Sequence, residues 1–273
     1  MYSCERALQF WRTGFIIAND ESGLIARGVP NDLAVQDSGS PILILVASVD
    51  VKKTRLYVDV KGYSANGVTW TLEYIKIKGN TDDFSGVWDR LDTILGNKRY
   101  IGTDGKVYRI QITMIGYSYN PDYVYEYVKK RSSGVFAIKG REFLASGETY
   151  QFFSPLAQKK IGLANALHVS TGKLKDRISD VITSSFWIPG QPQPPWYPNF
   201  REDCCDKYFK QLKAGRYEKK QDIPALDCYA YNLAALELAA EFWCREHLSL
   251  PTLDWAAFWE LAKSGEFYTE EAS

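Results

Sequence analysis

Apolar runs separated by short polar turns dominate residues 42–78, and their pattern predicts strands. Residues 42–50 are almost uniformly apolar, which is typical of a strand covered on both faces. Residues 55–63 and 68–78 alternate between apolar and polar side chains, as half-buried strands do. In the run over residues 55–63, one face carries Leu56, Val58 and Val60. In the run over residues 68–78, one face carries Trp70, Leu72 and Tyr74, and the other carries Ile75 and Ile77. Because only short turns join the three runs, we predict an antiparallel meander.

Helical and strand patterns alternate after the meander. Residues 83–96 have apolar side chains at helical spacing and end in a glycine, and residues 108–117 match a strand. Residues 120–131 begin with Asn and Pro, a common helix start, and residues 134–139 form a short fifth strand. We therefore predict an α/β fold flanked by helices, with a mixed five-stranded sheet of three antiparallel strands followed by parallel ones. This order of elements resembles that of the ribonuclease H-like fold.

The second half of the chain is less regular. We predict a helix over residues 173–184, an extended proline-rich loop over 188–198 and a short helix over 202–212. A stronger helix begins near Asp222 and Pro224. From Pro251 onward we predict one more helix, packed through Trp255 and Trp259.

These elements predict three segments. They are a helical lead-in and linker over residues 1–40, the α/β domain over residues 41–248, and an acidic helical tail over residues 249–273.

The composition, with 45% hydrophobic and 24% charged residues, is that of an ordinary soluble globular protein. No apolar run approaches twenty residues and no signal-peptide layout is present, so we expect no membrane partner and a cytoplasmic location. The five cysteines form no CxxC pair and only two histidines accompany them, which disfavours zinc sites and a disulfide framework. A metal site would therefore consist of carboxylates, which favours Mg²⁺ or Mn²⁺.

The formal net charge of zero conceals two segments of opposite charge. Residues 129–220 contain 17 Lys and Arg against 8 Asp and Glu, a net of +9, whereas residues 221–273 contain 2 against 10, a net of −8. The basic segment suits contacts with phosphates, and solvated surface lysines would produce the same count.

Asp50 ends the first apolar run, just before Lys52 and Lys53. An interior carboxylate is costly without a partner, so we expect Asp50 at the exposed end of its strand. Two interpretations remain open. Asp50 either begins a hairpin turn or binds a metal ion.

Four motifs in this order resemble the nuclease domain of the phage terminase large subunit, in the lambda-type A-protein family. The family pattern has VDVQ, a hairpin, a strand ending in ID, then VFAIKGR and a helix beginning with ALDC. This chain has VDVK at residues 49–52, VFAIKGR at 135–141, KDR at 175–177 and ALDC at 225–228. With gaps, the resemblance extends over residues 42–238.

The resemblance implies a two-metal endonuclease that cuts concatemeric double-stranded DNA during packaging in the host cytoplasm. Asp50 and Asp227 would bind two Mg²⁺ or Mn²⁺ ions, one activating water and the other stabilising the leaving oxygen. The candidate phosphate contacts are Lys52, Lys139, Arg141 and Lys175. The implied protein partners are the terminase small subunit, the portal or a separate ATPase motor chain.

The chain departs from the family pattern at three points. Gly116 stands where the family's fourth strand carries an acid, and Pro224 stands where an acid often precedes ALDC. Asp122 and Glu73 are the alternative ligands. No GxxxxGK[ST] motif occurs, so we expect a nuclease-like domain without its motor, as a fragment, a split-gene product or a relic.

Three hypotheses follow. The chain is an active metal-dependent endonuclease, or it is a catalytically silent ribonuclease H-like module that binds DNA or a packaging partner. In the third, the basic tracts are solvated surface and the C-terminal helices mediate assembly.

Overall fold

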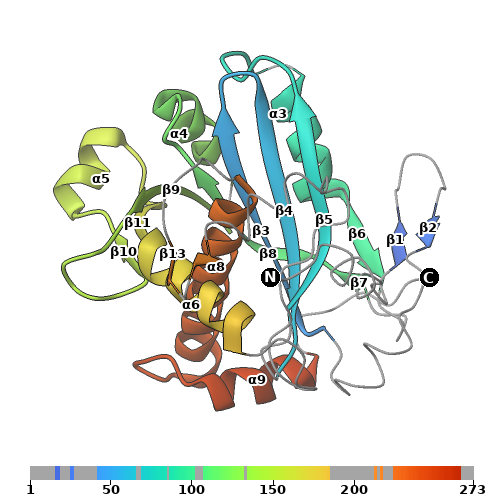
Figure 1. Cartoon of the computed structure of the whole chain (residues 1–273), viewed down its shortest axis with the longest axis vertical. Helices are drawn as coiled ribbons and strands as arrows, with labels where there is room; N and C mark the ends of the chain where they lie inside the picture. Colours follow the sequence, from blue (N-terminus) through green and yellow to red (C-terminus); the bar gives the residue numbers. More distant parts are fainter. Residues whose placement is uncertain are drawn as a thin grey trace.

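A seven-stranded mixed sheet forms the centre of the protein (Figure 1). The computed structural model describes residues 16–18, 25–27, 42–65, 69–84, 86–101, 107–131, 134–184, 212–213, 216–217 and 224–265. The sheet has the order β10-β11-β9-β8-β3-β4-β5. Its strands are β3 (Ile44–Lys52), β4 (Arg55–Tyr63), β5 (Thr69–Lys78), β8 (Ile110–Gly116), β9 (Val135–Arg141), β10 (Tyr150–Phe152) and β11 (Ala166–Ser170).

The strand directions confirm the predicted order of antiparallel and parallel pairing. β3, β4 and β5 form the antiparallel meander, and β8 then pairs with β3 in parallel. β9 and β11 continue in parallel, and β10 closes the edge in the antiparallel direction. All five predicted strands belong to this sheet. The predicted strand number was wrong, because the short strands β10 and β11 extend it.

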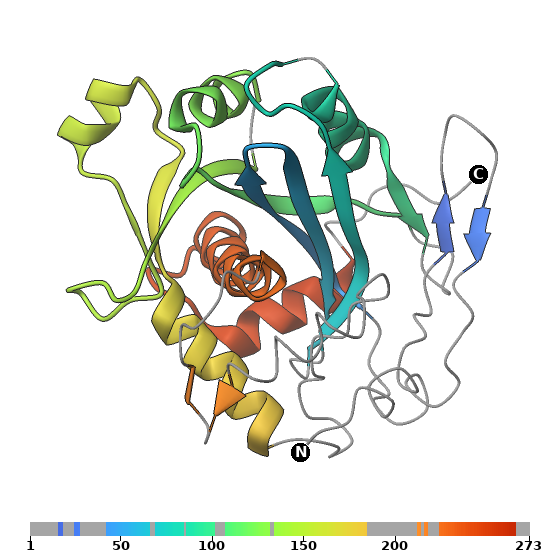
Figure 2. The same cartoon turned by 45° about the horizontal axis from the view of Figure 1, so that its top comes forward.

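Helices cover both faces of the sheet (Figure 2). α3 and α4 pack on one face, and α8, α6 and α9 lie on the other. The helices are α3 (Val87–Asp92), followed by a π-helical turn at Thr93–Asn97, then α4 (Pro121–Lys129), α5 (Pro155–Ile161), α6 (Thr171–Ser184), α8 (Pro224–Leu248) and α9 (Trp255–Ser264). Among the helices described, none is both long and apolar enough to cross a lipid bilayer.

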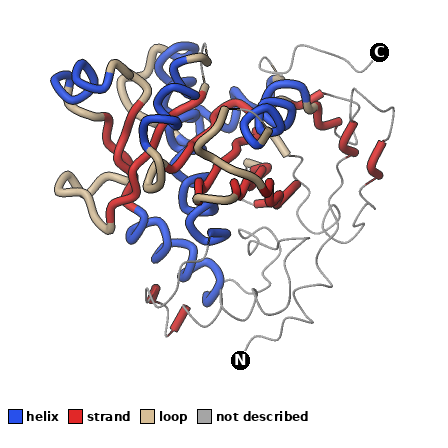
Figure 3. The backbone as a smooth tube through the Cα atoms, turned by 90° about the horizontal axis from the view of Figure 1, so that it is seen from above, coloured by secondary structure: helices blue, strands red, loops and turns tan. Residues whose placement is uncertain are grey.

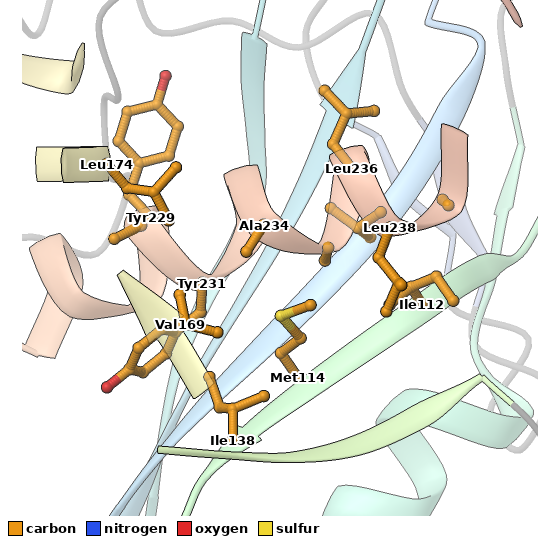
Figure 4. Close-up of a cluster of buried hydrophobic side chains, with 14 of the residues drawn as sticks. Ile112, Met114, Ile138, Val169, Leu174, Tyr229, Tyr231, Ala234, Leu236 and Leu238 are labelled. Atoms are coloured by element: carbon orange, nitrogen blue, oxygen red, sulfur yellow. The ribbon is translucent and has the colours of Figure 1, made fainter. Parts of the chain in front are cut away.

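Two cores explain the apolar run of β3. Because side chains of a strand alternate between faces, Ile44 and Val46 pack toward α8, while Leu45 and Ala47 pack toward α3 and α4. Figure 4 shows the first core, with side chains of α8 meeting those of β8, β9 and β11. Both faces of β3 are therefore dry, as its sequence predicted.

A β-bulge changes the predicted faces of β5. The pairing register shifts between Val60 and Lys61, so one extra residue of β5 lies opposite β4. Tyr74 therefore packs in the core under α8, whereas Leu72 packs in the opposite core with Ile77. The prediction that Leu72 and Tyr74 share a face was wrong for this reason.

The helices predicted over residues 83–96, 120–131 and 173–184, from near Pro224, and after Pro251 are present with shifted ends and contacts. α3 begins at Val87, and its last turn is π-helical, so Gly96 lies within that turn instead of capping the helix. In α9 the buried anchor is Phe258, which is 0% exposed, and Trp259 packs partly buried beside it. Trp255 is 37% exposed and packs at the rim, with its ring stacked on Trp259 and edge-on to Phe258.

Short strands outside the main sheet were not predicted. A second sheet has the order β2-β1-β6-β7 and lies at the side of the molecule away from α5 (Figures 1 and 3). Its strands are β1 (Ile16–Ala18), β2 (Ile25–Arg27), β6 (Arg99–Ile101) and β7 (Val107–Tyr108), and β12 (Leu212–Lys213) pairs separately with β13 (Arg216–Tyr217).

These short strands overturn part of the predicted lead-in and of the helix over residues 202–212. Ile16 and Ile17 are in a strand, which overturns the helical prediction there, and Leu212 is in β12. Apart from β1 and β2, residues 1–40 lie outside the described residues, as do the predicted loop over 188–198, residues 202–211 and Asp222. The three-segment division stays a prediction.

Candidate metal and nucleic-acid site

Asp50 lies inside strand β3, on the face covered by α8. The strand continues to Lys52, and the turn to β4 follows it, so the interpretation of Asp50 as a turn residue was wrong. Alternation directs Ser48, Asp50 and Lys52 to the same face. The Lys52 Nζ lies 3.1 Å from an Asp50 carboxylate oxygen, and the Asp50 side chain is 7% exposed. A nearly buried carboxylate is thereby compensated by a neighbour on its own strand.

Asp227 lies in the first turn of α8, where the helix dipole favours a negative charge. Its carboxylate forms an ion pair with Lys175 of α6, whose side chain is only 7% exposed. Lys175 was predicted to contact phosphate. In this structure its ammonium group lies on the carboxylate of the second predicted metal ligand.

The buried thiol of Cys228 lies in the electric field of both carboxylates. Burial raises its pKa well above the ordinary value, and the negative charges of Asp50, Asp59 and Asp227 raise it further. The Ser48 hydroxyl donates to the Cys228 carbonyl over 2.8 Å, which binds the start of α8 to β3. The charges of Asp50 and Asp227 therefore both act on one buried thiol, and the first turn of α8 lies against β3 near Asp50.

Gly116 is the direct neighbour of Asp50 across the parallel pair of β3 and β8. It lies on the α8 face, as Met114 does. A Cβ atom at position 116 would lie 3.3 Å from Cε2 of Tyr231 and 3.6 Å from its hydroxyl oxygen. The position of the missing acid is therefore beside Asp50, and the ring of Tyr231 covers it.

The two alternative ligands lie elsewhere. Glu73 pairs with Val60 on the opposite face of the sheet and forms an ion pair with Lys98. Burial raises the pKa of Glu73, and the Lys98 charge opposes that shift. Asp122 is exposed in the first turn of α4, which packs on that same opposite face. Neither joins Asp50 and Asp227, and the described residues contain no cluster of three or more His, Cys, Asp and Glu side chains suited to a metal ion.

The carboxylates present fit one divalent cation better than two. Mg²⁺ is commonly held by one or two carboxylates together with waters and substrate phosphate. Asp50 and Asp227 supply that number within the described part of the chain. A two-ion site would need a further bridging acid, and the strand position for it carries Gly116.

The remaining basic candidates lie at the same edge of the sheet but on its other face. Lys139 and Arg141 alternate with Ile138, which packs toward α8, so they point toward the side of α4. Lys139 is opposite His168 of β11, and the Arg141 Nε lies 3.4 Å from His168 Nδ1. Burial and these two cations lower the pKa of His168. The four predicted phosphate contacts thus form two groups, one on each face.

A buried polar belt between the sheet and α8 was missed by the sequence analysis. Asp59 and Lys61 of β4 are both 0% exposed and lie 3.4 Å apart as an ion pair. The Lys61 ammonium lies 4.4 Å from the ring centre of Tyr229, and the Asn232 amide donates to the Asp59 carbonyl over 3.2 Å. Alternation indicated that Asp59 and Lys61 share a face. It gave no sign that α8 would cover that face.

A cavity of about 440 Å³ lies beside α8 but away from the two carboxylates. Its lining includes Lys173 and Arg177 of α6 and Glu237 of α8. Glu237 is ion-paired with Arg177 and accepts a hydrogen bond from Thr149. Because Glu237 is already paired with groups that line the cavity, the cavity adds no ligand to the site around Asp50.

Comparison with known proteins gave one family. The family model described as "Terminase large subunit gpA, endonuclease domain" matches residues 11–247 of the 273 in the chain. A search of the curated proteins gave no match.

Proposed function

Because the chain belongs to the family of the terminase large subunit gpA endonuclease domain, we propose that it cleaves double-stranded DNA during phage packaging with a divalent cation held by Asp50 and Asp227. Mg²⁺ and Mn²⁺ fit the oxygen-only donor set. The order of strands and helices is consistent with a ribonuclease H-like fold, which we include in the proposal.

The observation that supports this function best is the convergence of the two carboxylates. Asp50 and Asp227 are 177 residues apart in the chain, yet both charges act on the Cys228 thiol. Asp50 lies near the carboxyl end of the central strand β3, where α/β sheets commonly bind ligands, and Asp227 precedes Cys228, whose carbonyl accepts a hydrogen bond from Ser48 of that strand. Neither residue marks the boundary of its element, because β3 continues past Asp50 to Lys52 and α8 begins at Pro224, before Asp227.

Each side chain has a distinct task in the proposed reaction. The carboxylates of Asp50 and Asp227 would hold the cation, which supplies charge stabilisation and an activated water when bound. Lys52 and Lys175 neutralise these carboxylates in the structure described here. Once a cation neutralises the acids, the same ammonium groups would turn to the phosphodiester, since lysine is a compact, rotatable point charge.

DNA would lie over the carboxyl edge of the sheet. Lys139 and Arg141 would contact phosphates on the α4 side, while Lys52 and Lys175 act on the α8 side. Contacts of this kind position the duplex without reading its sequence. The terminase small subunit, the portal and a separate ATPase motor chain are the protein partners that we propose.

The test is cleavage of supercoiled plasmid in the presence of Mn²⁺ or Mg²⁺. We expect Asp50→Asn and Asp227→Asn each to reduce the rate by roughly 100-fold or more, since even groups behind a metal ligand cost roughly 10- to 100-fold. Asp89→Asn, at an exposed site on α3, is the matched control and should cut normally. Undiminished cutting by Asp50→Asn would refute the assignment.

The glycine at position 116 is the one observation that favours a second function, that of a catalytically silent module. Without an acid on β8, the chain would bind DNA or a packaging partner without cutting it. Wild-type protein that retards DNA in a gel yet leaves plasmid intact with either cation would support this silent module over the nuclease.

A further inference from the structure

Two glycines on neighbouring strands create the space that Tyr231 fills. Gly116 of β8 and Gly140 of β9 both face α8 at the carboxyl edge of the sheet. A Cβ at position 140 would lie 3.3 Å from the Tyr231 hydroxyl oxygen and 3.0 Å from Cγ2 of Thr171. At position 116 the nearest atom is Cε2 of the same tyrosine, at 3.3 Å. The ring and hydroxyl of Tyr231 thus extend over both glycines.

Tyr231 reaches this position from the helix that carries Asp227. The two residues are four apart on α8, so they lie on one side of the helix, one turn apart. Figure 4 shows Tyr231 pointing toward Ile138 and Val169, while Tyr229 points to the other side of α8. The Tyr231 side chain is 5% exposed. It is therefore a packed part of the site and not a mobile surface group.

An acid at position 116 would share its space with this ring. Neighbouring strands lie about 4.8 Å apart, so an aspartate at 116 would project beside Asp50 on the same face. That arrangement is what two cations about 3.5–4 Å apart require. Here the Cβ atom of such an aspartate would lie 3.3 Å from the ring of Tyr231, so the carboxylate and the ring would compete for space.

We propose that Tyr231 replaces the third acidic side chain of the site, so that Asp50 and Asp227 hold one divalent cation and not two. This inference rests on the proposed function, because it concerns the cation used in that reaction. The exchange is coupled, because a Cβ atom at position 116 or 140 would lie 3.3 Å from an atom of Tyr231 and would have to displace its side chain. A single-cation site relies more on Lys52 and Lys175 to offset the charge of the phosphodiester.

The direct test is the number of Mn²⁺ ions bound by the full chain, measured by calorimetry and by electron paramagnetic resonance. We expect one ion for the wild type and for Tyr231→Ala. Gly116→Asp/Tyr231→Ala should bind two, because removal of the ring gives the new carboxylate its space. Gly116→Asp alone should bind no second ion and should melt at a lower temperature.

The outcomes separate this inference from the proposed function. Three outcomes would overturn the inference and leave the nuclease proposal standing. They are two ions bound by the wild type, a second ion bound by Gly116→Asp alone, and no second ion bound by the folded double variant. No ion on the wild type would overturn both.

A milder pair of variants keeps the test independent of the charged substitution. Gly116→Ala should lower the melting temperature when Tyr231 is present and raise it in the Tyr231→Ala background, since alanine is otherwise preferred to glycine in a strand. An increase in both backgrounds would show that the ring does not restrict position 116, and would overturn the inference.

Discussion

The buried pair of Asp59 and Lys61 gives the sharpest test of how α8 is attached to the sheet. We consider Lys61→Met, which keeps most of the side-chain volume and removes the ammonium group. Burial lowers the pKa of Lys61, and the nearby Asp59 carboxylate opposes that shift. Without Lys61, the fully buried Asp59 carboxylate would lose the cation 3.4 Å away.

Removing one partner of a buried ion pair typically costs about 3–5 kcal/mol, because the other charge stays desolvated. At about 2–4 °C per kcal/mol for a domain of roughly this size, the melting temperature should fall by about 6–20 °C. Loss of the cation–π contact with Tyr229 acts in the same direction. The double variant Asp59→Leu/Lys61→Met removes both charges, and we expect its stability within about 1 kcal/mol of the wild type.

The assay is urea unfolding followed by circular dichroism, with Lys53→Met in the exposed β3–β4 turn as the matched control. The control should change stability by less than about 0.5 kcal/mol. If Lys61→Met cost less than about 1 kcal/mol, or if the double variant were no more stable than the single one, Asp59 and Lys61 would not be energetically coupled.

Three further predictions concern the edge of the sheet and α9. Arg141→Ala should reduce the slope of log affinity for DNA against log salt by about 1, as expected for one lost phosphate contact, and an unchanged slope would exclude that contact. The pKa of His168 is lowered from its ordinary 6.5, so the unfolded chain binds the proton more readily and stability falls as the pH drops through that region. Between about pH 7.5 and 5.5 the melting temperature of the wild type should therefore fall more than that of His168→Gln. Equal falls would show that His168 does not cause the pH dependence. Phe258→Ala should cost about 3–5 kcal/mol in urea unfolding, whereas Trp255→Ala should cost less than about 1 kcal/mol, and similar values would place the anchor of α9 elsewhere.

Patterns that depend on one element could be predicted from the sequence, and those that depend on two could not. The apolar run of β3 and the Asn-Pro start of α4 determine their elements locally, so both were predicted within a few residues. The faces of β5 were not, because a single-residue bulge opposite β4 reverses them without a mark in the hydrophobic pattern.

The same distinction applies to the site. The motifs indicated Asp50, Asp227 and the empty position at Gly116, and the parallel register of β3 and β8 places Gly116 beside Asp50. Tyr231 was not predicted, because its role depends on glycines 91 and 115 residues away along the chain. Lys139 and Lys175 looked equivalent in sequence, yet alternation in β9 and burial in α6 place them in different surroundings.

The distance along the chain between Asp50 and Asp227 also has a consequence for the order of synthesis. Translation proceeds from the N-terminus, and β3 with its neighbouring strands emerges long before α8. An incomplete chain that ends between residues 170 and 227 contains the strands of the sheet with Asp50 but lacks the second carboxylate. The proposed cutting site therefore does not exist on the ribosome until α8 is made, and prematurely terminated products lack half of it.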